Sequence, residues 1–369
     1  MQITAERDSL AAALAIANRA TASLKPASMF PAALRLSATA DQLAVASTDG
    51  DLSIMTVTAI PVSAEGGTVL APAKLLAAIV GALPPGSVSL TSTSDALEVK
   101  AGRSHFTLRT FPTDNLPPMS RVDAPKVEVD AALLRTSLTQ VVFAASPDAL
   151  RPVLTGVLVE AQSDGLRLVA TDSYRLVYRD VPGLRVLGDR PSALVPSRVL
   201  TELQRLLTGV DTVDVYLGEQ QVAFQAGATY LSGRLIEGEF PNYRPLLPTE
   251  PPPSRLTVEC EPLLAAIKRV ALVAAGDKTT PVRVQFTTEG VRVSVQTSDG
   301  ATASEQVDAK YEGDDLTLGF NPAFLTEGIA ALGTDTVVLG LTNEVKPAII
   351  TGAEDEGGPV QILMPVRLS

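Results

Sequence analysis

Apolar and polar positions follow two different periods along this chain, and one succession of the two occurs three times. Each time, a short strand pattern of alternating character leads into an acidic residue and then into apolar residues at helical spacing. The three openings are Ile3–Leu10, Val127–Leu134 and Thr257–Leu264. Period 2 indicates a strand with one buried face, and apolar residues at i, i+3 and i+4 indicate an amphipathic helix. The acidic residue suits the unpaired N–H groups at a helix start.

Two further landmarks recur along the chain. Alternating strands flank three short polar runs that predict hairpin turns, and these contain Asp49, Asp172 and Asp299. A second amphipathic helix pattern opens at Pro72, at Pro196 and at Asn321. Successive copies of each landmark lie about 125 residues apart, so all of them share one period. A tandem triplication explains this period.

Each repeat predicts an α+β domain of strand, helix, strands, helix and strands, with two helices packed on antiparallel sheets. The expected helical windows are residues 5–25, 72–83, 130–146, 196–209, 260–278 and 321–332. Proline-rich stretches at 116–125 and 248–253 indicate linkers, and the second reads as a stiff one. The predicted domains are residues 1–122, 123–253 and 254–369.

Similar domains in series, related by a constant rotation, trace an arc that either continues as a filament or closes with a second copy. The whole chain of 369 residues carries a net charge of −11, whereas its six helical windows together are slightly positive. This contrast fits a ring whose helices face a polyanion. Ordinary solvated helix faces explain the charge pattern equally well when it is taken alone.

The composition narrows the chemistry. With 46% hydrophobic residues the chain has enough apolar surface to fold, which excludes a mostly disordered protein. Cys260 and His105 are the only residues of their types, so an internal disulfide and most zinc or histidine-dependent sites are excluded. The common nucleotide, metalloprotease and hydrolase motifs do not occur. We predict no enzyme activity, no metal, no cofactor and, without an apolar span of ~20 residues, a cytoplasmic protein.

Four strings carry a resemblance to a known family. They are Arg151–Glu160, Val169–Leu176, Gly233–Arg244 and the terminal Met364–Leu368. Together with the length and the repeat, they resemble the bacterial DNA polymerase III beta subunits, the replicative sliding clamps, over the whole chain. The resemblance implies a head-to-tail homodimer whose six domains form a ring around duplex DNA, with helices lining the hole and sheets outside.

The resemblance also implies the function and its partners. Such a ring catalyses nothing but tethers the replicative polymerase to DNA without reading its sequence, which gives processivity in DNA replication. An ATP-driven clamp loader opens and closes the ring. The loader, the polymerase subunit, repair polymerases, ligase and mismatch-repair proteins are expected to dock through short linear motifs in one pocket per subunit.

The family's functional positions map onto this chain by motif. The implied peptide-binding residues are Leu154, Thr171, Ser173, Tyr174, Arg175, Leu176, Pro241, Asn242, Pro245, Leu246, Ile362, Met364, Pro365, Val366, Arg367 and Leu368. The implied DNA contacts are Lys25, Lys74, Arg198 and Arg205. The dimer seam is expected to bring Ile79 and Leu108 against Leu272 and Val273 of the second copy.

Two other classes of function compete with this interpretation. A hydrolase or transferase would need convergent carboxylates, and the sequence offers repeated acids only at turns. A monomeric scaffold that binds peptides without encircling DNA would use the same apolar residues. Without the family resemblance, Leu154 and Leu176 would be assigned to the hydrophobic core.

Overall fold

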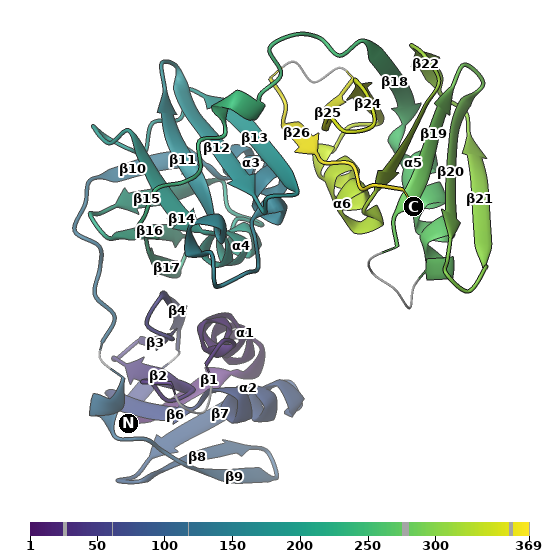
Figure 1. The fold of residues 1–369 in the computed structure, drawn as a ribbon. Helices are drawn as coiled ribbons and strands as arrows, with labels where there is room; N and C mark the ends of the chain where they lie inside the picture. Colours follow the sequence, from purple (N-terminus) through teal and green to yellow (C-terminus); the bar gives the residue numbers. More distant parts are fainter. Residues whose placement is uncertain (25–27, 61, 117, 275–279, 354–356, 369) are drawn as a thin grey trace. The chain divides into compact units, whose positions relative to one another are not determined.

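The computed structural model describes residues 1–24, 28–60, 62–116, 118–274, 280–353 and 357–368 (Figure 1). The chain forms two compact units, each built from two segments of the sequence. Unit 1 consists of Met1–Leu134 and Arg198–Leu235, and unit 2 consists of Arg135–Ser197 and Ile236–Ser369. The middle part of the sequence is therefore divided between the two units.

One order of elements occurs three times, as the sequence period predicted. The first copy contains β1 (Gln2–Glu6), α1 (Arg7–Asn18), η1 (Arg19–Thr21), β2 (Ala33–Ala38), β3 (Gln42–Thr48), β4 (Leu52–Ala59), β5 (Val62–Glu65), β6 (Gly67–Pro72), α2 (Ala73–Ala82), β7 (Ser87–Ser92), β8 (Ala96–Ala101), β9 (Ser104–Arg109) and η2 (Thr113–Asn115).

The second copy contains β10 (Lys126–Asp130), α3 (Ala131–Val141), η3 (Val142–Ala144), η4 (Pro152–Leu154), β11 (Gly156–Gln162), β12 (Gly165–Thr171), β13 (Arg175–Pro182), β14 (Ser192–Pro196), α4 (Ser197–Leu206), β15 (Thr212–Leu217), β16 (Gln221–Ala226), β17 (Thr229–Arg234) and η5 (Arg244–Leu246).

The third copy contains β18 (Ser254–Glu259), α5 (Cys260–Ala271), η6 (Leu272–Ala274), β19 (Val282–Thr287), β20 (Gly290–Gln296), β21 (Thr302–Val307), β22 (Lys310–Glu312), β23 (Leu316–Phe320), α6 (Pro322–Leu332), β24 (Thr336–Leu341), β25 (Ala348–Gly352) and β26 (Val360–Leu363).

The first helix of each copy is shorter than its predicted window. α1, α3 and α5 end at Asn18, Val141 and Ala271, and each is followed directly by a 3₁₀ turn. The tighter turn continues the apolar spacing for a few residues, which is why the pattern suggested a longer α-helix. At the other end, the carboxylate of Asp130 accepts a hydrogen bond from the N–H of Leu133 at 2.7 Å and caps α3.

The three predicted aspartate turns are all present. Asp49 joins β3 to β4, Asp172 joins β12 to β13, and Asp299 joins β20 to β21. Asp49 Oδ1 accepts hydrogen bonds from the N–H groups of Asp51 at 3.0 Å and Leu52 at 2.8 Å. This local bonding is the reason that aspartate favours such turns.

Each copy builds two four-stranded antiparallel arrays. In the first copy the strand orders are β1-β7-β8-β9 and β6-β2-β3-β4, with β5 added beside β1. In the second copy they are β10-β15-β16-β17 and β14-β11-β12-β13. In the third copy they are β18-β24-β25-β26, with β22 beside β18, and β23-β19-β20-β21.

Neighbouring copies are joined through the edges of these arrays. β4 pairs with β17, where Ile54 lies opposite Leu231, and the two arrays merge into an eight-stranded sheet in unit 1. β13 pairs with β26 in the same way within the nine-stranded sheet of unit 2. The equivalent strands of the remaining arrays, β9 and β21, are end strands of their sheets among the described residues.

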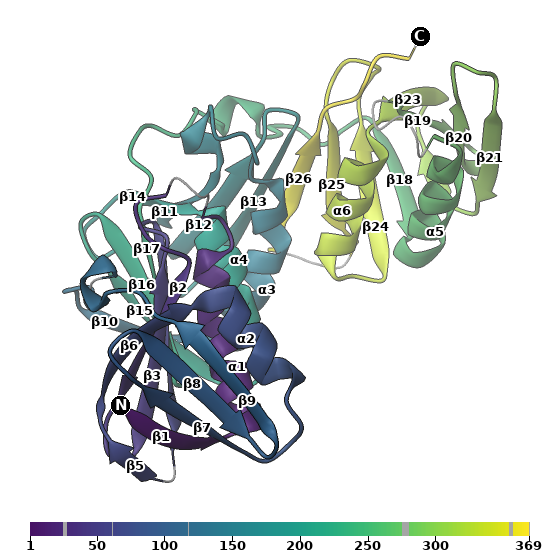
Figure 2. The same cartoon turned by 90° about the horizontal axis from the view of Figure 1, so that it is seen from below.

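In the first and third copies the two helices contact each other and pack against the strands. In the first copy, Leu10 and Leu14 of α1 and Leu76 and Val80 of α2 belong to one buried cluster with the strands. Figure 2 shows where α5 and α6 of the third copy lie. The two helices contact each other and contribute side chains to a second buried cluster. Among the described residues, no helix has the length and apolar character needed to cross a membrane.

Candidate functional site

The segments that the resemblance assigns to peptide binding meet in unit 2. The start of β13 pairs with the end of β26, so that Leu176 lies opposite Ile362. Beyond β26, the N–H of Met364 donates to the carbonyl oxygen of Tyr174 at 2.9 Å. The C-terminal tail, defined here as Met364–Leu368, therefore begins beside the aspartate turn of the second copy.

An apolar cluster lies beneath this junction. Its buried members are Leu158, Val169, Leu176, Leu194, Tyr243 and Ile362. Leu176 is only 3% exposed, and Leu154 and Ile362 are buried as well. These three predicted binding residues are thus core side chains. For Leu154 and Leu176, this is the assignment that the sequence supports without the family resemblance.

Other predicted residues present apolar surface around the same junction. Tyr174 is 62% exposed, and Leu246, Met364 and Val366 are also exposed; we call these four side chains the apolar patch. Pro241, Asn242, Pro245 and Arg367 are exposed too. Thr171 is buried at the end of β12, and its hydroxyl donates to the carbonyl oxygen of Arg175 at 2.6 Å.

The aspartate turn holds Tyr174 in place. Asp172 Oδ1 accepts hydrogen bonds from the N–H groups of Tyr174 at 2.9 Å and Arg175 at 3.0 Å. Ser173, at the top of the turn, has a φ of 82°, a left-handed conformation that is costly for a residue with a side chain. Its hydroxyl oxygen accepts a hydrogen bond from Arg151 Nη1 at 2.9 Å, which helps to hold that conformation.

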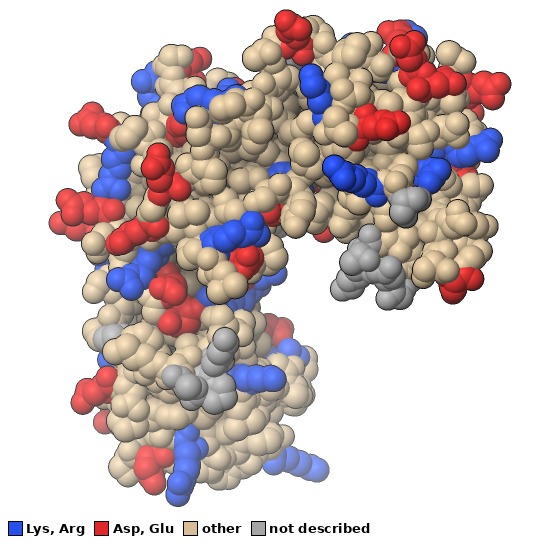
Figure 3. Space-filling view, in the orientation of Figure 1, with Lys and Arg blue, Asp and Glu red and all other residues tan. Residues whose placement is uncertain are grey.

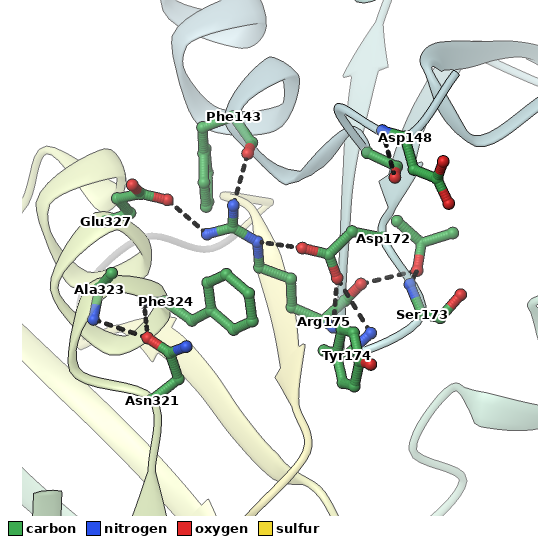
Figure 4. Close-up of polar contacts among 12 residues, drawn as sticks. Phe143, Asp148, Asp172, Ser173, Tyr174, Arg175, Asn321, Ala323, Phe324 and Glu327 are labelled. Atoms are coloured by element: carbon green, nitrogen blue, oxygen red, sulfur yellow. Dashed lines mark hydrogen bonds and ion pairs between the residues drawn. The ribbon is translucent and has the colours of Figure 1, made fainter. Parts of the chain in front are cut away.

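Arg175 is enclosed by protein rather than presented to a ligand (Figure 4). Its Nε donates to Asp172 at 3.0 Å, and its Nη2 donates to the carbonyl oxygen of Phe143 at 2.8 Å. Its Nη1 donates to Glu327 of α6 at 2.6 Å. The guanidinium carbon lies 4.3 Å from the ring centroid of Phe324, and the side chain is only 10% exposed. No local sequence pattern points to Phe143, Phe324 or Glu327, because they lie far from Arg175 along the chain.

The segment after β17 adds a polar anchor that the residue assignments missed. The buried Tyr243 donates from its hydroxyl to Glu160 Oε2 at 2.7 Å, and Arg244 Nη2 donates to Glu160 Oε1 at 2.9 Å. Burial, together with the hydrogen bond to Glu160, raises the pKa of Tyr243. This anchor fixes the segment that carries Leu246. Tyr243 lies within the string Gly233–Arg244 that resembles the family, so the sequence did contain a signal for this anchor.

The predicted DNA contacts differ in their surroundings. Lys74 is exposed on α2, and Arg205 of α4 pairs with Glu202. Arg198 pairs with Asp49 of the first copy and donates from Nη2 to the carbonyl oxygen of Ala20 at 3.2 Å. Lys25 lies outside the described residues.

The pairing of Arg198 with Asp49 has an electrostatic signature. Burial of the Asp49 carboxylate opposes its ionisation, but hydrogen bonds from Ser23 and Arg198 outweigh burial and hold the pKa of Asp49 below its usual value. The positive charge of Arg198 is therefore partly balanced by the carboxylate of Asp49. On the face shown in Figure 3, basic and acidic side chains are interspersed rather than gathered into one basic patch.

The predicted seam residues lie near the two end strands. Leu272 is 70% exposed on η6, and Val273 beside it is also exposed. Leu108 of β9 is buried in the core of the first copy, and Ile79 of α2 packs against that core. Phe106 is exposed on β9 and was not assigned. Its place two residues from Leu108, on the same face of a strand, was the available signal.

The remaining chemistry is sparse. Among the described residues, no group of three or more His, Cys, Asp and Glu side chains is arranged to hold a metal ion. Cys260 is buried at the start of α5, and burial raises the pKa of its thiol.

Comparison with known proteins covers the whole chain. The N-terminal, central and C-terminal domain families of the DNA polymerase III beta subunit match residues 1–120, 128–242 and 244–367. The beta sliding clamp of Streptomyces coelicolor is 36% identical over 380 residues, which covers 100% of both chains, and that of Synechococcus elongatus is 31% identical with the same coverage. The crystal structure of a sliding clamp from Bartonella birtlesii bound to griselimycin has a TM-score of 0.91 at 26% identity and covers 100% of both chains.

Proposed function

This chain belongs to the DNA polymerase III beta subunit family of sliding clamps, and from that membership we propose how its parts carry out the family's task. The protein is a sliding clamp that encircles duplex DNA and tethers the replicative polymerase, so that synthesis becomes processive. It works by topology, without chemistry on its partners.

The observation that carries this proposal is the edge pairing between copies. The first copy offers β4 to β17 of the second, and the second copy offers β13 to β26 of the third. By the order of elements, β21 is the equivalent of β4 and β13, whereas β9 is the equivalent of β17 and β26. A third joint of the same kind therefore pairs β21 of one subunit with β9 of a second subunit. Two such joints close a head-to-tail dimer.

Side chains beside these strands support the seam. Leu272 and Val273 expose apolar surface next to the array that ends in β21. Phe106 exposes apolar surface on β9, two residues from Leu108, and Ile79 packs against the core that contains Leu108. Burial of such surface favours association by about 25 cal/mol for each Å² that leaves water.

We assign partner docking to the apolar patch and its surroundings. Tyr174, Leu246, Met364 and Val366 suit the aliphatic or aromatic anchors of a short linear motif, because they present apolar surface and the flexible methionine adapts to different shapes. The sixteen predicted residues remain the proposed site, with Leu154, Leu176 and Ile362 beneath it. Clamp loader, repair polymerases, ligase and mismatch-repair proteins are the proposed users, besides the polymerase.

The proposed DNA contacts are few and independent of sequence, as sliding requires. Lys74 and Arg205 lie on helices. Arg198 is the third proposed contact, although its charge is partly balanced by Asp49. Lys25 keeps its predicted role. The clamp has no catalytic residues in this proposal and acts in the cytoplasm. Its three domains keep the predicted bounds of 1–122, 123–253 and 254–369.

The experiment that tests this function compares circular and linear DNA. Protein loaded by a clamp loader and ATP onto a nicked plasmid is expected to stay bound in moderate salt and to leave once the plasmid is linearised. Equal lifetimes on both forms would contradict encirclement and favour a scaffold that does not surround DNA. Unassisted binding is expected to be weak and strongly salt-dependent.

A further inference from the structure

One position in the strand before the second helix is a leucine in the first two copies and a glycine in the third. Counting back two residues from the landmarks Pro72, Pro196 and Asn321 gives Leu70, Leu194 and Gly319. In every copy the carbonyl oxygen of this residue accepts a hydrogen bond from the segment that follows the last strand. The donors are the N–H groups of Phe111 at 2.9 Å, Ile236 at 2.9 Å and Val366 at 2.8 Å.

In the first two copies the leucine side chain anchors that following segment. Leu70 is buried with Leu116 and packs against Phe111. Leu194 is buried with Tyr243 and packs against Ile236. The strand thus supplies the apolar side chain, and the linker that leads to the next copy covers it.

In the third copy the two roles are exchanged. A Cβ atom added to Gly319 would lie 2.5 Å from the carbonyl oxygen of Val366 and 2.8 Å from Cδ2 of Leu368. Real Cβ contacts do not come this close, so the space of the missing side chain is already taken by the tail. Here the strand leaves an empty space beside Gly319, and Leu368 of the tail fills it.

The tail has few other attachments among the described residues. Met364 is held by its hydrogen bond to Tyr174, and Val366 by its hydrogen bond to Gly319. Pro365 has no N–H to donate. Leu368 otherwise borders a groove of about 910 Å³, lined mainly by hydroxyl and amide side chains with Arg283. The contact of Val366 and Leu368 with Gly319, which we call the seat, is therefore what fixes the far end of the tail.

We propose that Gly319 is a positioning residue: its missing side chain leaves the seat for Leu368, and this seat sets the tail as one wall of the peptide site. The second half rests on the proposed function, because it assumes that peptides bind beside the tail. Gly319 does not touch the peptide in this arrangement. It acts through Val366 and Leu368.

The test uses the full dimeric protein with Gly319→Ala. Hydrogen exchange at the Val366 amide reports the seat, and its protection is expected to fall roughly tenfold or more because the added methyl displaces the tail. The affinity for a fluorescent peptide of Gln-Leu-aliphatic-Phe type is expected to fall about tenfold, equivalent to about 1.4 kcal/mol. Gly81→Ala is the matched control, because a Cβ there meets nothing within 4 Å. The protein is expected to stay folded and dimeric in both variants.

Leu368→Ala provides a second route to the same answer. It keeps the backbone pairing and empties the seat, so it is expected to loosen Val366 less than Gly319→Ala does. Because both changes release the same tail, the double variant is expected to be no worse than Gly319→Ala alone.

Wild-type protection of Val366 in Gly319→Ala, or additive effects in the double variant, would overturn the seat. A released tail with unchanged peptide affinity would overturn its role as a wall, provided that Tyr174→Ala still weakens the peptide. If Tyr174→Ala and removal of the tail also leave the affinity unchanged, the proposed peptide site itself is wrong, and the exchange data alone decide the seat.

Discussion

Arg175 Nη1 lies 2.6 Å from Glu327 Oε2, so the first residue of β13 is tied to a helix of the following copy. The same guanidinium binds Asp172 in its own turn, and the side chain lies between the rings of Phe143 and Phe324. The contact links the turn that carries Tyr174 to α6. Arg175 therefore fixes one side of the apolar patch from beneath.

Replacing Arg175 by Ala is expected to destabilise the protein by about 3 kcal/mol or more, because the carboxylate of Asp172 stays buried without its partner. Glu327→Gln is expected to cost less than about 1 kcal/mol, since Glu327 is half exposed. Urea unfolding at one fixed protein concentration measures both. Lys310→Ala is the control, because the pair of Lys310 with Glu312 is exposed and lies outside this turn. Equal losses from Arg175→Ala and Lys310→Ala would contradict the structural role of Arg175.

The pair of Asp49 with Arg198 is expected to make stability depend on pH. The folded state holds the pKa of Asp49 below its usual value, so the pair stabilises the protein above about pH 4 and this contribution is lost as the pH falls further. The difference in free energy of unfolding between wild type and Arg198→Ala is therefore expected to narrow below about pH 4. Unfolding curves from pH 3 to pH 7 measure it. With Asp49→Asn in both proteins the narrowing is expected to vanish; a gap that stays constant with pH in the parent pair would rule out this linkage.

Combining Leu272→Ala with Val273→Asp is expected to give monomers at micromolar concentration. The change removes apolar area from the seam and buries a charge without a partner, which costs several kcal/mol, roughly. Sedimentation velocity measures the state of association. Val345→Asp is the matched control, because Val345 is 70% exposed and lies outside the seam. A dimeric double variant would move the seam elsewhere.

Tyr174→Ala is expected to weaken a labelled partner peptide about tenfold or more, because Tyr174 is the most exposed side chain of the apolar patch. Removing residues 365–369 is expected to abolish the binding while dimerisation stays intact. Fluorescence anisotropy measures both, with Leu150→Ala as an exposed control. Leu176→Ala is a poorer probe than the sequence suggested. Leu176 is buried, so its loss is expected to destabilise the fold by about 2–5 kcal/mol.

The repeat was predictable from the sequence because strands, helices and turns have local signatures. Asp49, Asp172 and Asp299 bond their own backbones, so each turn is encoded within a few residues. The joints between copies were not encoded in this way. Nothing in the sequence near Ile54 indicates that Leu231 lies opposite, because edge pairing depends on how complete domains meet.

The candidate site was predicted in its segments and not in the roles of its side chains. The motif placed Arg175 at the junction, but a guanidinium suits both a solvent-facing rim and a buried ion pair. Its partners Phe143 and Glu327 come from the 3₁₀ turn η3 and from α6, which no local pattern connects to the aspartate turn. Gly319 escaped notice because the sequence shows a missing side chain without showing what takes its space.

The pairings of edge strands between copies also differ in how readily they re-form after they break. The joint at β4 and β17 and the joint at β13 and β26 link strands of one chain, so a broken joint re-forms at a high effective concentration set by the linker. The proposed joint between β21 and β9 of separate subunits would carry no linker and would obey mass action. Dilution is therefore expected to act on this joint alone. In the proposed dimer, the joint that no linker spans is therefore the place where the ring would open.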